Sequence, residues 1–136
     1  LVFYLAGGFV ATFTQTAMTL LFGTAAEAHV PTLGASGAIA AVLGAYFVLY
    51  PNSTVRGLIV IFPIQLSAWF FLGAWFLYQL IEANFGLWGA SANGGGVAFF
   101  AHVGGFVFGF IVARLLLGAG RVAPQDGRAP LRRLPA

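Results

Sequence analysis

Four stretches of mostly apolar residues run along the chain, separated by segments rich in glycine, proline and charged residues. The apolar stretches cover residues 1–22, 36–50, 58–81 and 96–117. All but the second reach the length of about 20 residues that a helix needs to cross a bilayer. Because a helix satisfies its own backbone hydrogen bonds in lipid, the pattern predicts an all-α, polytopic membrane helix bundle in one domain over residues 1–117.

The composition agrees with a membrane protein. The chain is 60% hydrophobic and 7% charged, whereas soluble domains carry about 25% charged residues. It contains no cysteine, which excludes disulfides and thiolate metal sites. The lipid bilayer is therefore the expected environment, and the net positive charge is better explained by membrane topology than by nucleic-acid binding.

The charged residues separate onto two faces of the predicted bundle. Four crossings place both chain ends on one side, with Arg56 after the second span and Arg114 near the end of the fourth. All six arginines fall on this face, which the positive-inside rule assigns to the cytoplasm. The Arg- and Pro-rich tail, residues 118–136, is predicted to be cytoplasmic and disordered. The opposite face carries Glu27, His29 and Glu82.

The second span is too short to cross the bilayer. As a helix, residues 36–50 rise about 21 Å, against a hydrocarbon core of about 30 Å. If Pro51 marks one membrane surface, Ser36 lies about 9 Å below the other, and the segment before it must dip into the membrane. Irregular backbone at that depth is tolerated only where protein covers it or water reaches it. Ser36 is therefore a candidate functional residue.

His102 in the fourth span lies at a similar depth. Counting back from Arg114 places it about 18 Å above the cytoplasmic surface, and the same scale places Ser36 about 21 Å above it. The two spans run in the same direction and carry small residues at helical spacing, which allows close packing in lipid. Close packing would bring the hydroxyl and the imidazole within hydrogen-bond reach. The expected packing residues are Ala40, Gly44, Gly105 and Gly109.

Such a pair is suited to nucleophilic catalysis. A neutral imidazole takes the proton of a serine hydroxyl near pH 7, so Ser36 is the candidate nucleophile and His102 the candidate general base. The backbone N–H groups around Ala35 and Ser36 are placed to hold an oxyanion, with Gly34 allowing close approach. No carboxylate lies at this depth, so the sequence allows a dyad rather than a triad.

Each of these features also has a simpler interpretation. Ser36 alone is more often a packing serine, and His102 alone can form an interhelical hydrogen bond or a proton relay. His29 is expected to be a solvated surface residue. The aromatic residues between positions 69 and 78 are typical of an interfacial belt, or they form a bulky lateral gate.

The two polar segments resemble a known family. The sequence GASG at residues 34–37, continued to Tyr46, is similar to the nucleophile helix of the rhomboid intramembrane serine proteases. The sequence AHVGG at residues 101–105, with Gly109, is similar to the last core helix of that family, which carries the catalytic base. The resemblance covers residues 1–117, and the two motifs together are far more specific than GxSG alone.

The resemblance implies an intramembrane serine endopeptidase with Ser36 as nucleophile, His102 as general base and the Ser36 N–H in the oxyanion hole. The implied substrates are membrane proteins whose transmembrane segments are cut near the outer face, in the plasma membrane of a bacterium or archaeon. Residues 58–81 would form the gate, and residues 85–95 would cap the site. Neither a metal nor an organic cofactor is implied.

The sequence departs from the family pattern in two ways. The four spans resemble the third to the sixth of six core helices, and the second family helix normally supplies a His and an Asn to the oxyanion hole. Because Leu1 already lies in an apolar run, we expect the chain to be part of a longer protein and inactive alone, since each lost donor costs about 10²–10³ in rate. Ala40 stands where some relatives place a Tyr that stacks on the base, so His102 must be oriented in another way or less firmly.

Two other functions fit parts of the sequence. An inactive relative would bind transmembrane helices without cutting them, but such relatives are expected to lose the serine or the histidine, and both are present. A transporter fragment would use His102 as a proton relay and would need further polar groups at mid-depth. We identify only Ser36 and His102 at that depth.

Overall fold

The computed structural model describes residues 1–23, 34–59, 62–88 and 98–123, which form four α-helices and one β-hairpin. The helices are α1 (Val2–Phe22), α3 (Ser36–Leu49), α4 (Ala68–Trp88) and α5 (Phe99–Gly118), and the strands are β1 (Thr54–Ile59) and β2 (Phe62–Ser67). The predicted helical bundle is confirmed. The helices expected over residues 1–22, 36–50 and 96–117 correspond to α1, α3 and α5.

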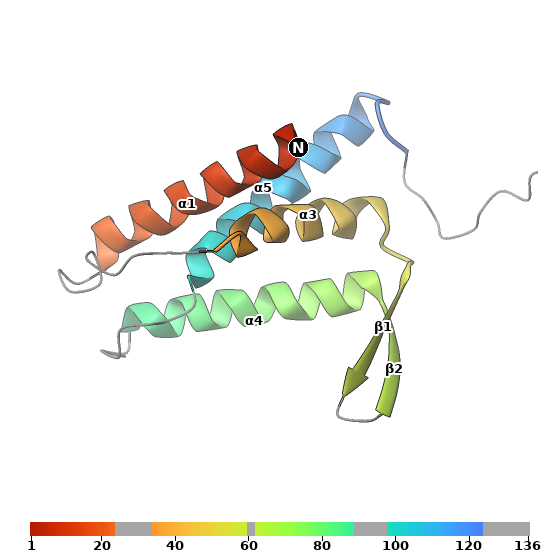
Figure 1. Ribbon diagram of the computed structural model, residues 1–136, viewed down its shortest axis with the longest axis horizontal. Helices are drawn as coiled ribbons and strands as arrows, with labels where there is room; N and C mark the ends of the chain where they lie inside the picture. The colour runs from red at the N-terminus through yellow and green to blue at the C-terminus, as the bar shows by residue number, and fades with distance from the viewer. Residues whose placement is uncertain (24–33, 60–61, 89–97, 124–136) are drawn as a thin grey trace, which may run out of the picture.

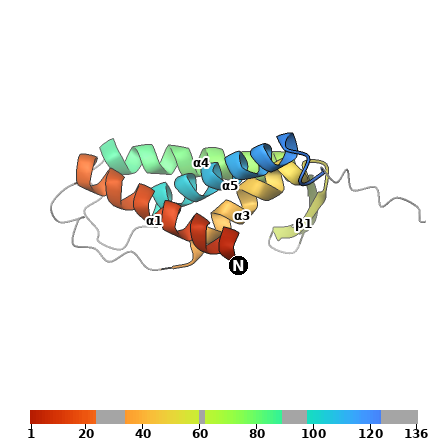
Figure 2. The same ribbon diagram turned by 90° about the horizontal axis from the view of Figure 1, so that it is seen from above.

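The helices pack around the α3–α5 pair (Figure 1). Helices α3 and α5 run in the same direction, and α1 and α4 run in the opposite direction. Helix α1 packs against both members of the pair on one side, and α4 packs against both on the other (Figure 2). The parallel α3–α5 pair is the arrangement that brings the first turns of the two helices to the same level.

Glycines allow the backbones of α3 and α5 to approach closely. A methyl group added at Gly105 would overlap the carbonyl oxygen of Gly37, and one added at Gly109 would overlap the carbonyl oxygen of Ala41. Gly44 lies in the same way against the backbone of α5. Because lipid provides no hydrophobic force between helices, this backbone contact supplies the van der Waals packing that holds the pair.

A small apolar core joins α3, α4 and α5. Its buried members are Ala40, Ala68, Leu72 and Phe106. The aromatic residues of α4 fall into two groups, one facing this core and one exposed. Trp75 and Phe76 pack against the core. The exposed aromatic residues are Trp69, Phe70, Phe71 and Tyr78. Helix α4 therefore presents one inward stripe at helical spacing and one broad apolar outer face.

The third helix begins later than the sequence analysis expected. Its predicted first residues lie instead in the antiparallel hairpin of β1 and β2. Gly57 and Pro63 disfavour a helix there, and the β-branched residues around them favour strands. Helix α4 then extends to Trp88, so residues 85–88 are helical rather than part of the expected loop. The rest of that loop lies outside the described residues, as does the tail from residue 124 on.

The described helices fit a bundle in a membrane. Helices α1 and α5 are long and apolar enough to cross a bilayer, and α3 is a shorter apolar helix. Figure 1 shows that α3 begins within the length of α1 and α4 rather than at the end of the bundle. Its first residue, Ser36, is therefore set back from that end, as the shortness of the second span predicts.

The start of α5 is tied to α1 through Gln15. The Ala101 N–H donates to Gln15 Oε1 at 3.2 Å, and Gln15 Nε2 donates to Thr19 Oγ1 at 3.2 Å. The N-cap residue of α5, Ala98, makes no side-chain cap bond. The Ala101 N–H also donates to the carbonyl oxygen of Ala98 at 3.0 Å, so Gln15 supplies a second acceptor in the first turn of α5 and joins that turn to α1.

Replacing Gln15 with leucine is expected to lower the free energy of unfolding by about 1 kcal/mol, the usual net contribution of one hydrogen bond. The measurement is the Tm of the purified full-length protein in detergent. Thr16→Val is the matched control, because Thr16 is exposed on the same helix and its replacement should leave the Tm unchanged. Equal Tm values for the Gln15→Leu variant and the wild type would show that the bond does not stabilise the fold.

Candidate active site

Ser36 is the first residue of α3, and its side chain is exposed. The backbone that leads into it turns at Gly34, whose φ is +130°, a value that residues with a side chain rarely adopt. Ala35, the N-cap residue, makes no side-chain cap bond. The N–H groups of the first turn, beginning with Ser36, have no partner within the helix, so they can donate to an acceptor outside it.

Replacing Gly34 with alanine is expected to lower the rate of substrate cleavage by about tenfold or more, because backbone strain of this kind costs about 1–3 kcal/mol. The nearest atom to an added Cβ is Ser36 Oγ at 3.7 Å, so the effect is conformational rather than steric. The matched control is Gly120→Ala, because Gly120 also has a positive φ but lies beyond α5 with open space around it. Wild-type activity of the Gly34→Ala variant would show that the turn does not position Ser36.

His102 lies in the first turn of α5 and is 8% exposed. Its Nδ1 is 2.7 Å from Oε1 of Gln79, a residue of α4 that is itself 4% exposed. The indole ring of Trp75 lies against the imidazole, with the ring centroids 5.9 Å apart and the planes inclined by 37°. The imidazole is therefore held between its own helix and α4.

Ser36 and His102 occupy neighbouring positions on two helices that touch. A Cβ at Gly37 would lie 3.6 Å from the Cβ of Ala101 and 3.4 Å from its carbonyl oxygen. The residue after Ser36 thus lies next to the residue before His102. The structure brings the two residues to one level of the bundle, where the depth comparison from the sequence placed them.

Residues of α3 and α5 also lie at a common level one helical turn after Ser36 and His102. Ala40, four residues after Ser36, and Phe106, four residues after His102, belong to one buried cluster. Ser36 Oγ makes no hydrogen bond to His102 in the part of the chain that the structure describes. Catalytic hydrogen bonds are often long in unliganded enzymes and tighten when substrate binds.

The groups available at this site are a hydroxyl, an imidazole and backbone N–H donors. Nδ1 of His102 is engaged by Gln79, so Nε2 is the ring nitrogen left to exchange a proton. No cluster of three His, Cys, Asp or Glu side chains able to hold a metal ion occurs among the described residues. The arrangement supports nucleophilic attack by the hydroxyl, with the imidazole as base.

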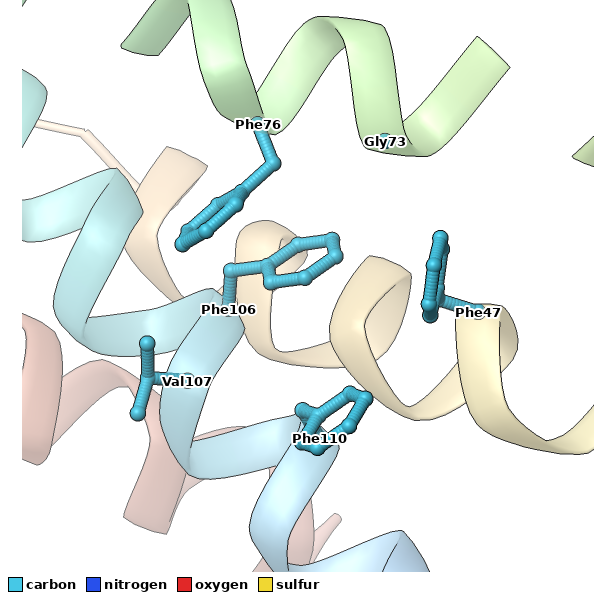
Figure 3. Close-up of a pocket in the computed structure, with 6 residues that line it drawn as sticks. All are labelled: Phe47, Gly73, Phe76, Phe106, Val107 and Phe110. Carbon is cyan, nitrogen blue, oxygen red and sulfur yellow. The ribbon is translucent and has the colours of Figure 1, made fainter. Parts of the chain in front are cut away.

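An apolar cavity of about 260 Å³ lies between α3, α4 and α5. Figure 3 shows the Phe106 ring between those of Phe76 and Phe47, with centroid separations of 4.4 and 6.0 Å. The cavity is lined by Phe47, Gly73, Phe76, Phe106, Val107 and Phe110. It contains no hydrogen-bonding or titratable side chain, so it provides shape and apolar surface but no chemistry.

Sequence reasoning missed Gln79 and its contact with His102. The residue is, with His102, one of the two buried polar residues of the described helices. Its position in the sequence carried a usable signal, because Ala68, Leu72 and Trp75 precede it on the same helical stripe. An uncharged polar residue on the buried stripe of a membrane helix indicates a polar partner on the facing helix.

One of three comparisons with known proteins gave a match. The family model described as Rhomboid domain matches residues 1–119, a range that includes both motifs and all the described helices. Comparisons with curated proteins and with solved structures gave no match. The matching family comprises intramembrane proteases, generally of the serine type, and inactive relatives. The chain belongs to the rhomboid family of membrane proteins.

Proposed function

We propose that this protein is an intramembrane serine endopeptidase in which Ser36 is the nucleophile and His102 the general base. The observation behind the proposal is the register of α3 against α5, in which Gly37 lies next to Ala101, so that Ser36 and His102 stand at one level of the two helices. Membership of the rhomboid family supports the reaction class.

In the first step, Ser36 Oγ forms a bond to the carbonyl carbon of the scissile peptide, and its proton passes to Nε2 of His102. The carbonyl π electrons move to oxygen, and this oxyanion accepts hydrogen bonds from N–H groups at the start of α3. The imidazolium then protonates the leaving amine, the C–N bond breaks, and an acyl-serine remains. Water activated by the same imidazole releases the second product and restores Ser36.

The charges of the described residues support a multi-pass arrangement with the C-terminus in the cytoplasm. Arg56, Arg114 and Arg121 are exposed, and they belong to the end of the bundle where α3 and α5 finish (Figure 1). Glu82 lies toward the end of α4 that faces the other way. By the positive-inside rule, the arginine end is cytoplasmic, so Ser36 acts toward the outer side, on transmembrane segments of membrane proteins.

A fluorophosphonate probe tests the proposal, because only an activated serine reacts with it. The full-length protein in membranes is expected to be labelled on Ser36, and the Ser36→Ala and His102→Ala variants are expected to lose the label. The Ser53→Ala variant is the control, because Ser53 lies in the turn after α3. A folded wild-type protein that takes no label and leaves every transmembrane substrate intact would instead be a helix-binding, inactive relative.

A further inference from the structure

Gln79 and His102 are the buried polar side chains of the described residues, with exposed fractions of 4% and 8%. Gln79 lies near the middle of α4, and His102 lies in the first turn of α5. A polar side chain in the apolar interior of a membrane bundle needs a partner. The 2.7 Å contact between Gln79 Oε1 and His102 Nδ1 makes each side chain the partner of the other.

This bond determines which ring nitrogen is available as the base. An amide oxygen only accepts hydrogen bonds, so an imidazole bonded to it through Nδ1 carries its hydrogen on Nδ1 and leaves Nε2 unprotonated. In the opposite tautomer, Nε2 would carry the hydrogen and would be unable to take the Ser36 proton. In soluble serine proteases, the wrong tautomer lowers the rate by about 10⁴-fold.

Trp75 acts on the same imidazole from one turn earlier on α4. Its ring centroid lies 5.9 Å from that of His102, within the range of aromatic ring contacts. The small side chain of Ala40 on α3 cannot stack on the base. One stripe of α4 therefore provides both the hydrogen bond and the ring contact that orient His102.

We propose that Gln79 is a positioning residue of the dyad, whose amide oxygen holds His102 as the Nδ1–H tautomer with Nε2 available to Ser36. This inference rests on the proposed function and extends it from two residues to three. It also makes the packing of α4 a condition for activity, because moving α4 away from α5 would break the bond that selects the tautomer.

The test compares two substitutions of Gln79 in the full-length protein, reconstituted in liposomes with a transmembrane substrate. Gln79→Leu removes the acceptor at similar volume, and kcat is expected to fall by about 10²-fold or more, the lower end of general acid–base contributions. KM should stay unchanged, because the amide contacts the base and not the substrate. Gln79→Glu keeps an acceptor, so activity should be largely retained.

The pH–rate profile separates positioning from a merely structural role. A carboxylate at position 79 favours the charged imidazolium, so the acid limb of the Gln79→Glu profile should move to higher pH. Leu72→Val is the matched control, because Leu72 lies on the same buried stripe of α4. Leu72→Val should lower the Tm without changing kcat or the pH–rate profile. Gln79→Leu should lower kcat even if its Tm is no lower than that of the Leu72→Val variant.

The outcomes distinguish this inference from the function on which it rests. If the Gln79→Leu variant cleaves at the wild-type rate with an unchanged profile while the Ser36→Ala variant is inactive, the positioning role is wrong and the protease function stands. If the Gln79→Glu variant is as inactive as the Gln79→Leu variant, the acceptor role is wrong. If the Ser36→Ala variant retains cleavage, the dyad itself is wrong.

Discussion

Replacing Ser36 with alanine is expected to lower the rate of substrate cleavage by about 10⁶-fold, the scale measured when the nucleophile is removed from a serine protease. The loss follows because Ser36 carries the one hydroxyl at the start of α3 among the residues that the structure describes. His102→Ala should cost about as much, since a serine without its base is a weak nucleophile. The measurement is cleavage of a transmembrane substrate by the full-length protein in liposomes.

The double variant sharpens this prediction. Residues that act as one unit show strongly non-additive losses, so Ser36→Ala combined with His102→Ala should be no less active than either single variant. The Ser53→Ala and His29→Ala variants are the controls and should cleave at the wild-type rate. If either single variant cleaved the substrate at close to the wild-type rate, the replaced residue would have no part in the mechanism.

Replacing Gly109 with alanine is expected to give the largest loss of stability of any single-methyl change in the described helices. The added Cβ would overlap the carbonyl oxygen of Ala41, a backbone atom that cannot move without shifting α3. Overpacking typically costs about 1–3 kcal/mol, and here the displacement falls on the helix pair that carries both residues of the dyad. Activity should therefore fall together with the Tm.

Gly118→Ala is the matched control for this substitution. Gly118 lies at the end of the same helix, and an added Cβ there meets no atom within 4 Å. Alanine is favoured over glycine in helices by about 1 kcal/mol, so the control should keep or raise the Tm. The close contact of α3 and α5 would be refuted if the Gly109→Ala variant were as stable as the Gly118→Ala variant.

Much of the fold followed from the hydrophobic pattern because membrane helices must satisfy their own backbone hydrogen bonds. The bounds of α1, α3 and α5 lie close to those expected, since apolar length and flanking turn residues determine them. Helix α4 was placed wrongly at its start, because a short apolar run with β-branched residues does not distinguish a strand from a buried helix. The hairpin formed where Gly57 and Pro63 disfavour helical backbone.

The sequence indicated the two reacting residues of the candidate site, Ser36 and His102, but not the residues that orient His102. The depth of Ser36 and the depth of His102 each came from counting helical rise to a membrane surface, a one-dimensional quantity that sequence contains. The roles of Ser36 and His102 as nucleophile and base stay predictions. What orients the base was left open, because Ala40 does not provide the ring that some relatives place against it.

By itself, the sequence predicted a helical membrane protein that resembles the rhomboid family, with a serine and a histidine at one depth on two spans. The spans and the depths follow from apolar length and helical rise, which are local properties, whereas the resemblance rests on the two motifs around Ser36 and His102. Only the tertiary structure decided that Gln79 of α4 reaches the imidazole of His102. That contact depends on the rotation and register of α4 against α5, which side-chain packing between the helices determines and no local pattern contains.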